Sequence, residues 1–81
     1  MKKVVIYTTP SCTYCVMAKK FFKENKVDFE EVDVAANQSK TEEMIKKSGQ
    51  MGVPVTIIGE GKNEEVLIGF DQAKMQKALE L

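Results

Sequence analysis

The sequence predicts an α/β protein in which a four-stranded mixed sheet is flanked by helices, in the order β-α-β-α-β-β-α. Three observations lead to this fold. Short β-branched and apolar runs alternate with segments of helical periodicity. A short helix between the first two strands implies a parallel crossover, and a short Gly-containing loop between the last two implies an antiparallel hairpin. The chain of 81 residues is predicted to form a single domain, 1–81.

The first strand is predicted over residues 3–8, which are mostly β-branched or aromatic. Their nearly continuous apolar centre is typical of a strand that is buried on both faces. Pro10 ends the strand, and the residue before a proline is biased away from helical geometry. We therefore expect a loop at residues 9–11 that leads directly into a helix.

The first helix is predicted over residues 13–25. At about 100° per residue, Cys15 belongs to an apolar stripe, and lysines occupy the opposite side. Cys12 stands at the start of the helix, rotated toward the polar side. The pattern predicts an accessible Cys12 and a shielded Cys15. The stripe also contains Tyr14, Ala18, Phe21 and Phe22.

The second strand is predicted over residues 27–34, where apolar and polar residues largely alternate. A second helix is predicted from about residue 40 to residue 48. Ser39 and Glu42 have the spacing of a capping box at its start. Gly49 is suited to end this helix in the left-handed conformation.

The last three elements follow from short patterns near the C-terminus. Residues 53–58 form an apolar run typical of a strand, and the loop 59–63 connects it to a fourth strand at residues 64–68. Asp71 is a good N-cap for a last helix that ends near Leu79.

Cys12 and Cys15 are the only cysteines, and their Cys-x-x-Cys spacing permits a redox-active disulfide, part of a metal site, or a structural cross-link. A cross-link over so short a loop adds little stability, because the gain grows with loop length. A closed zinc or iron-sulfur site usually needs four ligands, and the sequence has two thiols and no histidine. No metal is therefore expected. Thiol-disulfide exchange is the chemistry that remains.

The composition excludes several classes of function. The 12 lysines balance 12 carboxylates and there is no arginine, which argues against nucleic acid as a partner. No apolar run has the length of an export signal or a membrane span. The sequence offers no histidine for a Cys-His dyad and no glycine-rich nucleotide motif. We expect a cytoplasmic protein that receives electrons from a small thiol or from a partner protein.

Exchange requires a thiolate, and a thiol with the unperturbed pKa of about 8.5 is only about 3% ionised at pH 7. The sulfur of Cys12 is expected to receive help from the amides of Thr13, Tyr14 and Cys15 and from the positive end of the helix dipole. A stabilised thiolate is also a fast leaving group when a mixed disulfide is resolved. The placement of Cys12 therefore favours an enzyme that forms and releases mixed disulfides repeatedly.

Together with these features, three short stretches give the chain a resemblance to the glutaredoxins over essentially its whole length. They are Tyr7-Thr8-Thr9-Pro10-Ser11-Cys12-Thr13-Tyr14-Cys15, Val53-Pro54 and Gly69-Phe70-Asp71. The glutaredoxins have the thioredoxin-like fold. Thioredoxins themselves typically carry tryptophan immediately before the first cysteine, where this chain has Ser11.

The resemblance implies a glutathione-dependent enzyme that reduces protein disulfides and protein-glutathione mixed disulfides. Cys12 would be the nucleophile and Cys15 the resolving thiol, with glutathione as the reducing co-substrate and a monomer as the working form. A cis Val53-Pro54 peptide would face the thiols. The glutathione-binding residues implied in this way are Tyr14, Val53, Pro54, Phe70 and Asp71.

The chain also departs from the usual glutaredoxin pattern. The proline usual after the first cysteine is Thr13, a lysine common three residues before that cysteine is Thr9, and the threonine expected before Val-Pro is Gly52. The Gly69-Phe70 pair is similar to the glutaredoxin-like redoxins that serve ribonucleotide reductase and take electrons from thioredoxin reductase. These differences leave the electron source and the redox potential open.

Three alternatives to the glutathione-dependent enzyme therefore stand. One is a redoxin reduced by thioredoxin reductase. Another is an iron-sulfur module, in which Cys12 thiolates from two subunits and two glutathiones hold a cluster, although Cys15 offers a competing disulfide. The last is a domain whose two thiols are inert.

Overall fold

The computed structural model describes residues 3–50, 52–59 and 64–79, and the predicted order of elements is confirmed. One mixed sheet has the strand order β2-β1-β3-β4. β1 pairs in parallel with β2 and antiparallel with β3, which pairs antiparallel with β4. The elements are β1 (Val4–Thr8), α1 (Thr13–Glu24), β2 (Glu30–Asp33), α2 (Gln38–Ser48), β3 (Val55–Ile58), β4 (Glu65–Ile68) and α3 (Gln72–Leu79).

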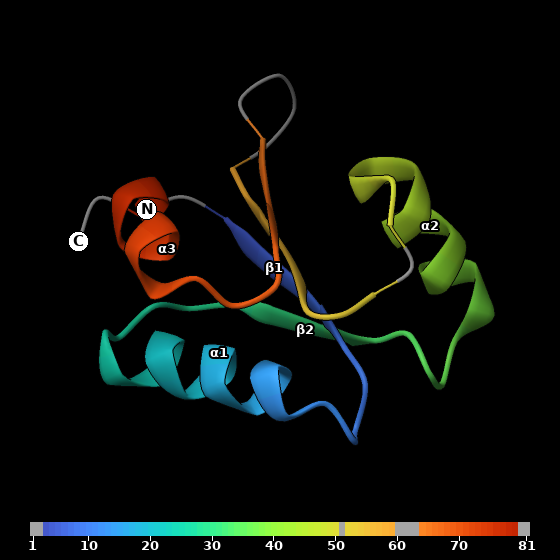
Figure 1. Ribbon diagram of the computed structural model, residues 1–81, viewed down its shortest axis with the longest axis horizontal. Coiled ribbons are helices and arrows are strands. Elements are labelled where there is room, and N and C mark those ends of the chain that lie inside the picture. Colours follow the sequence, from blue (N-terminus) through green and yellow to red (C-terminus); the bar gives the residue numbers. More distant parts are fainter. Residues whose placement is uncertain (1–2, 51, 60–63, 80–81) are drawn as a thin grey trace.

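The sheet lies between two helical layers, with α1 and α3 on one face and α2 on the other (Figure 1). β1 serves both layers because successive side chains of a strand point to opposite faces. Ile6 packs toward α1 and α3, and Tyr7 packs toward α2. The buried core on the first face contains Val4, Ile6, Ala18, Phe21, Phe22, Ile58, Met75 and Ala78, and the core on the second contains Tyr7, Val34, Met44, Val55 and Ile57.

β2 is shorter than the predicted strand 27–34, and the prediction was wrong for residues 27–29 and 34. After α1 the chain turns at Lys26, which has a positive φ of 57°. The amide of Val27 then donates to the carbonyl of Phe22 at 2.8 Å, which ties this segment to the end of the helix. Val27 and Phe29 still pack against the core, so their apolar pattern reflects burial without strand pairing.

The start of α2 was also predicted wrongly. The helix begins two residues earlier than expected, and its N-cap is Asn37 instead of Ser39. The Asn37 side-chain oxygen accepts from both the amide and the hydroxyl of Ser39, at 3.1 and 2.7 Å. Asparagine and serine cap helices about equally well. The end of α2 agrees with the prediction, since Gly49 adopts a left-handed φ of 74°.

β3 begins at Val55 instead of residue 53, because the chain first passes through a cis Val53-Pro54 peptide. Of the predicted loop 59–63, only Gly59 lies within the described residues. The bounds of the remaining elements agree with the sequence prediction to within one residue.

Thr56 on β3 has a polar atom in an apolar setting. The residue is completely buried, and in the described part of the chain its hydroxyl has no hydrogen-bond partner. An unpaired buried hydroxyl costs about 1–3 kcal/mol. We therefore expect Thr56→Val to raise the free energy of unfolding by about 1 kcal/mol, or Tm by roughly 4–8 °C for a domain of this size.

Thermal unfolding followed by circular dichroism measures this effect, and Thr8→Val is the matched control. Thr8 is buried to a similar degree, but its hydroxyl donates to Glu31 Oε2 at 2.9 Å. Its valine variant should therefore be less stable than the wild type. A Thr56→Val protein that lost stability as Thr8→Val does would show that the Thr56 hydroxyl has a partner in solution.

Candidate active site

The two cysteines lie where β1 gives way to α1. Thr8 ends the strand, and the following loop closes with a hydrogen bond from the Cys12 amide to the Thr9 carbonyl at 3.3 Å. Cys12 is the N-cap of α1 in an extended conformation, and its carbonyl accepts from the amide of Val16. The loop therefore places the first sulfur at the mouth of the helix.

The Cys12 sulfur has two polar contacts. It accepts from the amide of Cys15 at 3.2 Å, and its thiol donates to the carbonyl of Val53 at 3.8 Å. The first contact is a hydrogen bond from an amide at the start of the helix, as the sequence predicted. It comes from the amide of Cys15, not from all three amides that we expected. Both cysteines are free thiols, and Cys12 is partly exposed.

Cys15 is the shielded member of the pair. It has 0% exposure and packs on the buried side of α1 with Ala18 and Phe22. Burial raises the pKa of the Cys15 thiol to about 12, and its hydrogen bond with Cys12 acts in the same direction. The Cys15 thiol is therefore neutral at physiological pH in the reduced protein.

Two segments distant in sequence meet beside the thiols. The cis Val53-Pro54 peptide brings the Val53 carbonyl to Cys12. The amide of Gly69 donates to the carbonyl of Pro54 at 2.9 Å. This bond holds Gly69 beside Pro54, and Phe70 and Asp71 are the next two residues of the chain.

Phe70 and Asp71 begin the approach to α3. Asp71 caps this helix as predicted, since its Oδ1 accepts from the amide of Lys74 at 3.2 Å. The ring of Phe70 is partly buried and meets the ring of Phe21 edge-on, with centroids 6.1 Å apart. The fold thus brings Val53, Pro54, Phe70 and Asp71 into one chain of contacts that begins at Cys12.

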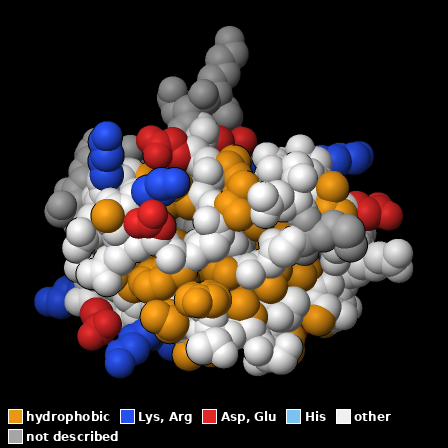
Figure 2. Space-filling view, in the orientation of Figure 1, with side chains coloured by type: hydrophobic (Ala, Val, Ile, Leu, Met, Phe, Trp, Pro, Cys, Tyr) orange, Lys and Arg blue, Asp and Glu red, His pale blue; other side chains and the backbone are white. Residues whose placement is uncertain are grey.

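Tyr14 was predicted to share the buried stripe of α1, and this was wrong. It is 59% exposed, and its neighbours Val16 and Met17 are exposed as well. Within the first turn of α1, Cys15 is fully buried whereas Tyr14, at the edge of the apolar stripe, is exposed, so helical periodicity alone overstates the width of the buried face there. Figure 2 shows hydrophobic side chains gathered on the surface over α1 and toward α3. Tyr14 is therefore placed at the rim of the site.

A polar network beside the thiols was not anticipated from the sequence. Glu31 Oε2, on β2, accepts from the hydroxyl of Thr8 at 2.9 Å and from the ammonium of Lys19 at 2.8 Å. The bond from Lys19 is the main cause that lowers the pKa of Glu31, so this carboxylate stays charged at neutral pH. The sequence prediction that the lysines of this helix lie opposite Cys15 was wrong for Lys19. At about 100° per residue, a residue four positions after Cys15 lies only about 40° from it, so the two share one face of α1.

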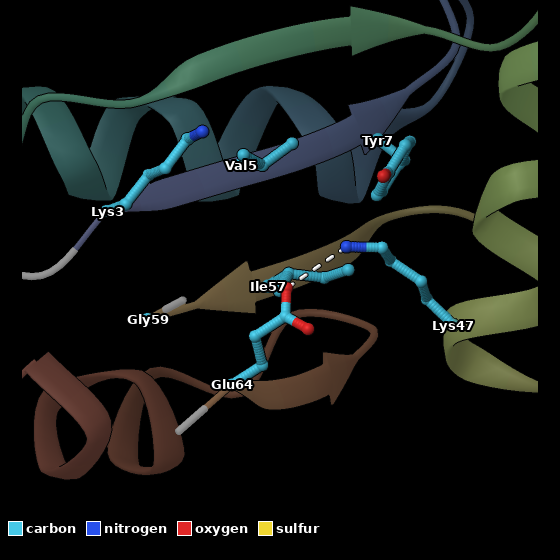
Figure 3. Close-up of a pocket in the computed structure, with 7 residues that line it drawn as sticks. All are labelled: Lys3, Val5, Tyr7, Lys47, Ile57, Gly59 and Glu64. Atoms are coloured by element: carbon cyan, nitrogen blue, oxygen red, sulfur yellow. Dashed lines mark hydrogen bonds and ion pairs between the residues drawn. The ribbon is translucent and has the colours of Figure 1, made fainter. Parts of the chain in front are cut away.

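Two cavities are lined by residues other than the cysteines. One, of about 440 Å³, lies between α1 and α3, and Met17, Phe21 and Phe70 are among its lining residues. The other, of about 300 Å³, lies on the α2 side of the sheet (Figure 3). The ion pair between Lys47 and Glu64, with Nζ and Oε2 3.0 Å apart, crosses it. Neither cavity is lined by a cysteine. The partial exposure of Cys12 and its hydrogen bonds place the candidate site at the start of α1.

Within residues 3–50, 52–59 and 64–79, no group of three or more Cys, Asp or Glu side chains is arranged to hold a metal ion. In the same part of the chain, no helix is long and apolar enough to cross a membrane.

Comparisons with known families, proteins and solved structures agree with the resemblance to the glutaredoxins. The glutaredoxin family model matches residues 4–62. An uncharacterized glutaredoxin-like 8.6 kDa protein from the rubredoxin operon of Clostridium pasteurianum is 36% identical over 77 residues, which are 95% of this chain and 97% of that protein. Glutaredoxin 3 of Escherichia coli K12 is 43% identical over 58 residues, covering 72% of this chain and 70% of the relative. The crystal structure of the thioredoxin-like protein BC3987 superimposes with a TM-score of 0.83 at 32% identity, covering 94% of this chain and 99% of that one.

Proposed function

The chain belongs to the glutaredoxin family, and from this premise we propose that it is a glutathione-dependent thiol-disulfide oxidoreductase. The observation that carries the proposal is the asymmetry of the two thiols. Cys12 is partly exposed at the mouth of α1 and accepts a hydrogen bond from the Cys15 amide, whereas Cys15 is fully buried. One thiol is placed to meet a substrate, and the other is placed to react only with its partner.

Reduction of a protein disulfide has two exchange steps, after which glutathione regenerates the enzyme. The Cys12 thiolate attacks one sulfur of a substrate disulfide, forms a mixed disulfide, and releases the other sulfur as a thiolate. For a protein disulfide, Cys15 then attacks Cys12, so the enzyme becomes oxidised and the substrate leaves reduced. Two glutathione molecules would return the enzyme to the dithiol form and leave as glutathione disulfide.

We further propose that glutathione lies along the chain of contacts from Cys12 to α3. The Val53 backbone would pair with the tripeptide as an added strand does, next to Pro54. Phe70 and Asp71 would receive the γ-glutamyl end, where the opening amides of α3 suit a carboxylate. Tyr14 would cover the glutathione sulfur from the exposed side. The position of Val53, whose carbonyl lies 3.8 Å from the Cys12 sulfur, supports this arrangement.

The partners that follow from this reaction are glutathione and proteins that carry disulfides or bound glutathione. We place the activity in the cytoplasm, where the glutathione pool keeps such a pair of thiols reduced. Thr9, Gly52 and Thr13 depart from the usual glutaredoxin pattern. A redoxin that is reduced by thioredoxin reductase is therefore the competing assignment.

A coupled assay separates the two assignments. With a glutathionylated protein as substrate, we expect NADPH oxidation through glutathione and glutathione reductase to run at least about tenfold faster than through thioredoxin reductase, because only the first route uses a glutathione groove. The Cys12→Ser variant lacks the nucleophile, so its rate of NADPH oxidation gives the background of each of the two assays. Faster turnover with thioredoxin reductase would assign the chain to the redoxins instead.

A further inference from the structure

We propose that Lys19 is a positioning residue for the resolving thiol: its ammonium group, held by Glu31, favours the Cys15 thiolate that attacks the mixed disulfide on Cys12. This inference rests on the proposed function, because it concerns the second exchange step. It assigns a role to a contact network that the first step does not need.

The helix places Lys19 beside Cys15. Residues four apart on an α-helix are neighbours on one face. Helical side chains also lean toward the N-terminus, so the side chain of Lys19 covers the turn that contains Cys15. The side chain of Lys19 is only 27% exposed, whereas the next residue, Lys20, is exposed on another side of α1.

The sheet fixes the position of this ammonium group. One oxygen of Glu31, Oε2, accepts from Lys19 at 2.8 Å and from the Thr8 hydroxyl at 2.9 Å. Thr8 is buried and ends β1, four residues before Cys12. The network therefore joins the strand before the reactive loop, the neighbouring strand β2, and the helical turn after Cys15. A lysine held in this way loses less side-chain entropy on each turnover than a mobile one does.

The resolving step needs such help, because a thiol held neutral by burial must ionise before it can attack. The Cys15 thiolate attacks the Cys12 sulfur, the Cys12–Cys15 bond forms, and the bond from Cys12 to the substrate breaks. The substrate sulfur leaves with the electron pair, and its later protonation balances the proton that Cys15 released to solvent.

Lys19 is a charged group that favours ionisation of Cys15, and the backbone of Thr9 acts in the same direction. Cys12, in the reactive loop, opposes ionisation, and Lys19, on α1, promotes it. Glu31, on β2, pairs with Lys19 and is itself influenced by Lys23.

Rapid mixing of the reduced protein with the chromogenic disulfide of thionitrobenzoate separates the two steps. Attack by Cys12 releases the first thionitrobenzoate, and attack by Cys15 on the resulting mixed disulfide releases the second. In Lys19→Met, we expect the rate of the second phase, relative to the first, to fall at least about threefold at pH 7. Loss of a neighbouring opposite charge changes a pKa by about one unit or more, and a tenfold loss of thiolate is offset roughly threefold by higher nucleophilicity.

Two further variants make the test specific. Lys20→Met removes the same charge from the same helix and should leave the ratio of the two rates as in the wild type. Lys19→Arg keeps a cation that can bond to Glu31 and should restore most of the ratio. An unchanged ratio in Lys19→Met, or an equal loss in Lys20→Met, would overturn the role of Lys19. A wild-type protein that shows no second phase would instead overturn the proposed function.

Discussion

Replacing Cys12 by serine is expected to lower both reduction of protein disulfides and removal of protein-bound glutathione by at least about 100-fold, because loss of a nucleophile removes the covalent route altogether. The remaining thiol cannot take over, since Cys15 is fully buried and burial raises its pKa to about 12. Glutathione-coupled turnover of each substrate measures the effect, and thermal unfolding of the same samples controls for loss of fold.

Replacing Cys15 by serine should separate the two substrates. A protein-glutathione mixed disulfide needs only Cys12 and external glutathione, so its reduction should continue at a rate comparable to that of the wild type. Reduction of a protein disulfide should fall to a small fraction, because the mixed disulfide on Cys12 then lacks its internal resolving thiol. If Cys12→Ser stayed active and Cys15→Ser were inactive, the roles of the two thiols would be the reverse of those proposed.

The reactive thiols could be placed from the sequence because local patterns determine their positions. The apolar run that becomes β1, the break at Pro10 and the period of α1 together put Cys12 at the helix mouth and Cys15 on the buried side. Each of these signals depends on residues within about one turn or one strand of the thiols. The structure confirms the difference in exposure that follows from them.

Predictions failed where a local pattern has more than one structural explanation. Val27 and Phe29 are apolar because they pack on the core beside the end of α1, and periodicity does not distinguish this from strand pairing. Asn37 and Ser39 are both good caps, and only the folded chain shows which one begins α2. Tyr14 falls at the edge of the apolar stripe of α1, and it is exposed although Cys15 in the same turn is fully buried.

Long-range contacts could not be predicted from the sequence, for a different reason. The network of Thr8, Lys19 and Glu31 joins three elements, and its contacts span 23 positions between Thr8 and Glu31. A threonine, a lysine and a glutamate in separate segments carry no pattern that predicts a shared hydrogen-bonded oxygen. Such a network becomes visible only when β1 and β2 are paired and α1 is packed across them.

The alkylation rates of the two single-thiol variants at pH 7 should differ by at least about 100-fold. Cys12 in the Cys15→Ser protein should react faster than Cys15 in the Cys12→Ser protein. Cys12 is partly exposed, whereas Cys15 is buried and has a pKa raised to about 12. A thiol with that pKa is only roughly 10⁻⁵ ionised at pH 7. Iodoacetamide labelling followed by mass spectrometry measures both rates, and labelling in denaturant, where the two rates should become similar, is the control.

The pH dependence of the slower reaction tests the cause. A raised pKa keeps the neutral thiol favoured at every pH below it, so labelling of Cys15 should accelerate about tenfold per pH unit from pH 7 to pH 10 and should not level off there. A thiol with an ordinary pKa would level off above about pH 9. Such a plateau for Cys15, or equal labelling of the two native thiols, would contradict the division between an accessible nucleophile and a buried resolving thiol.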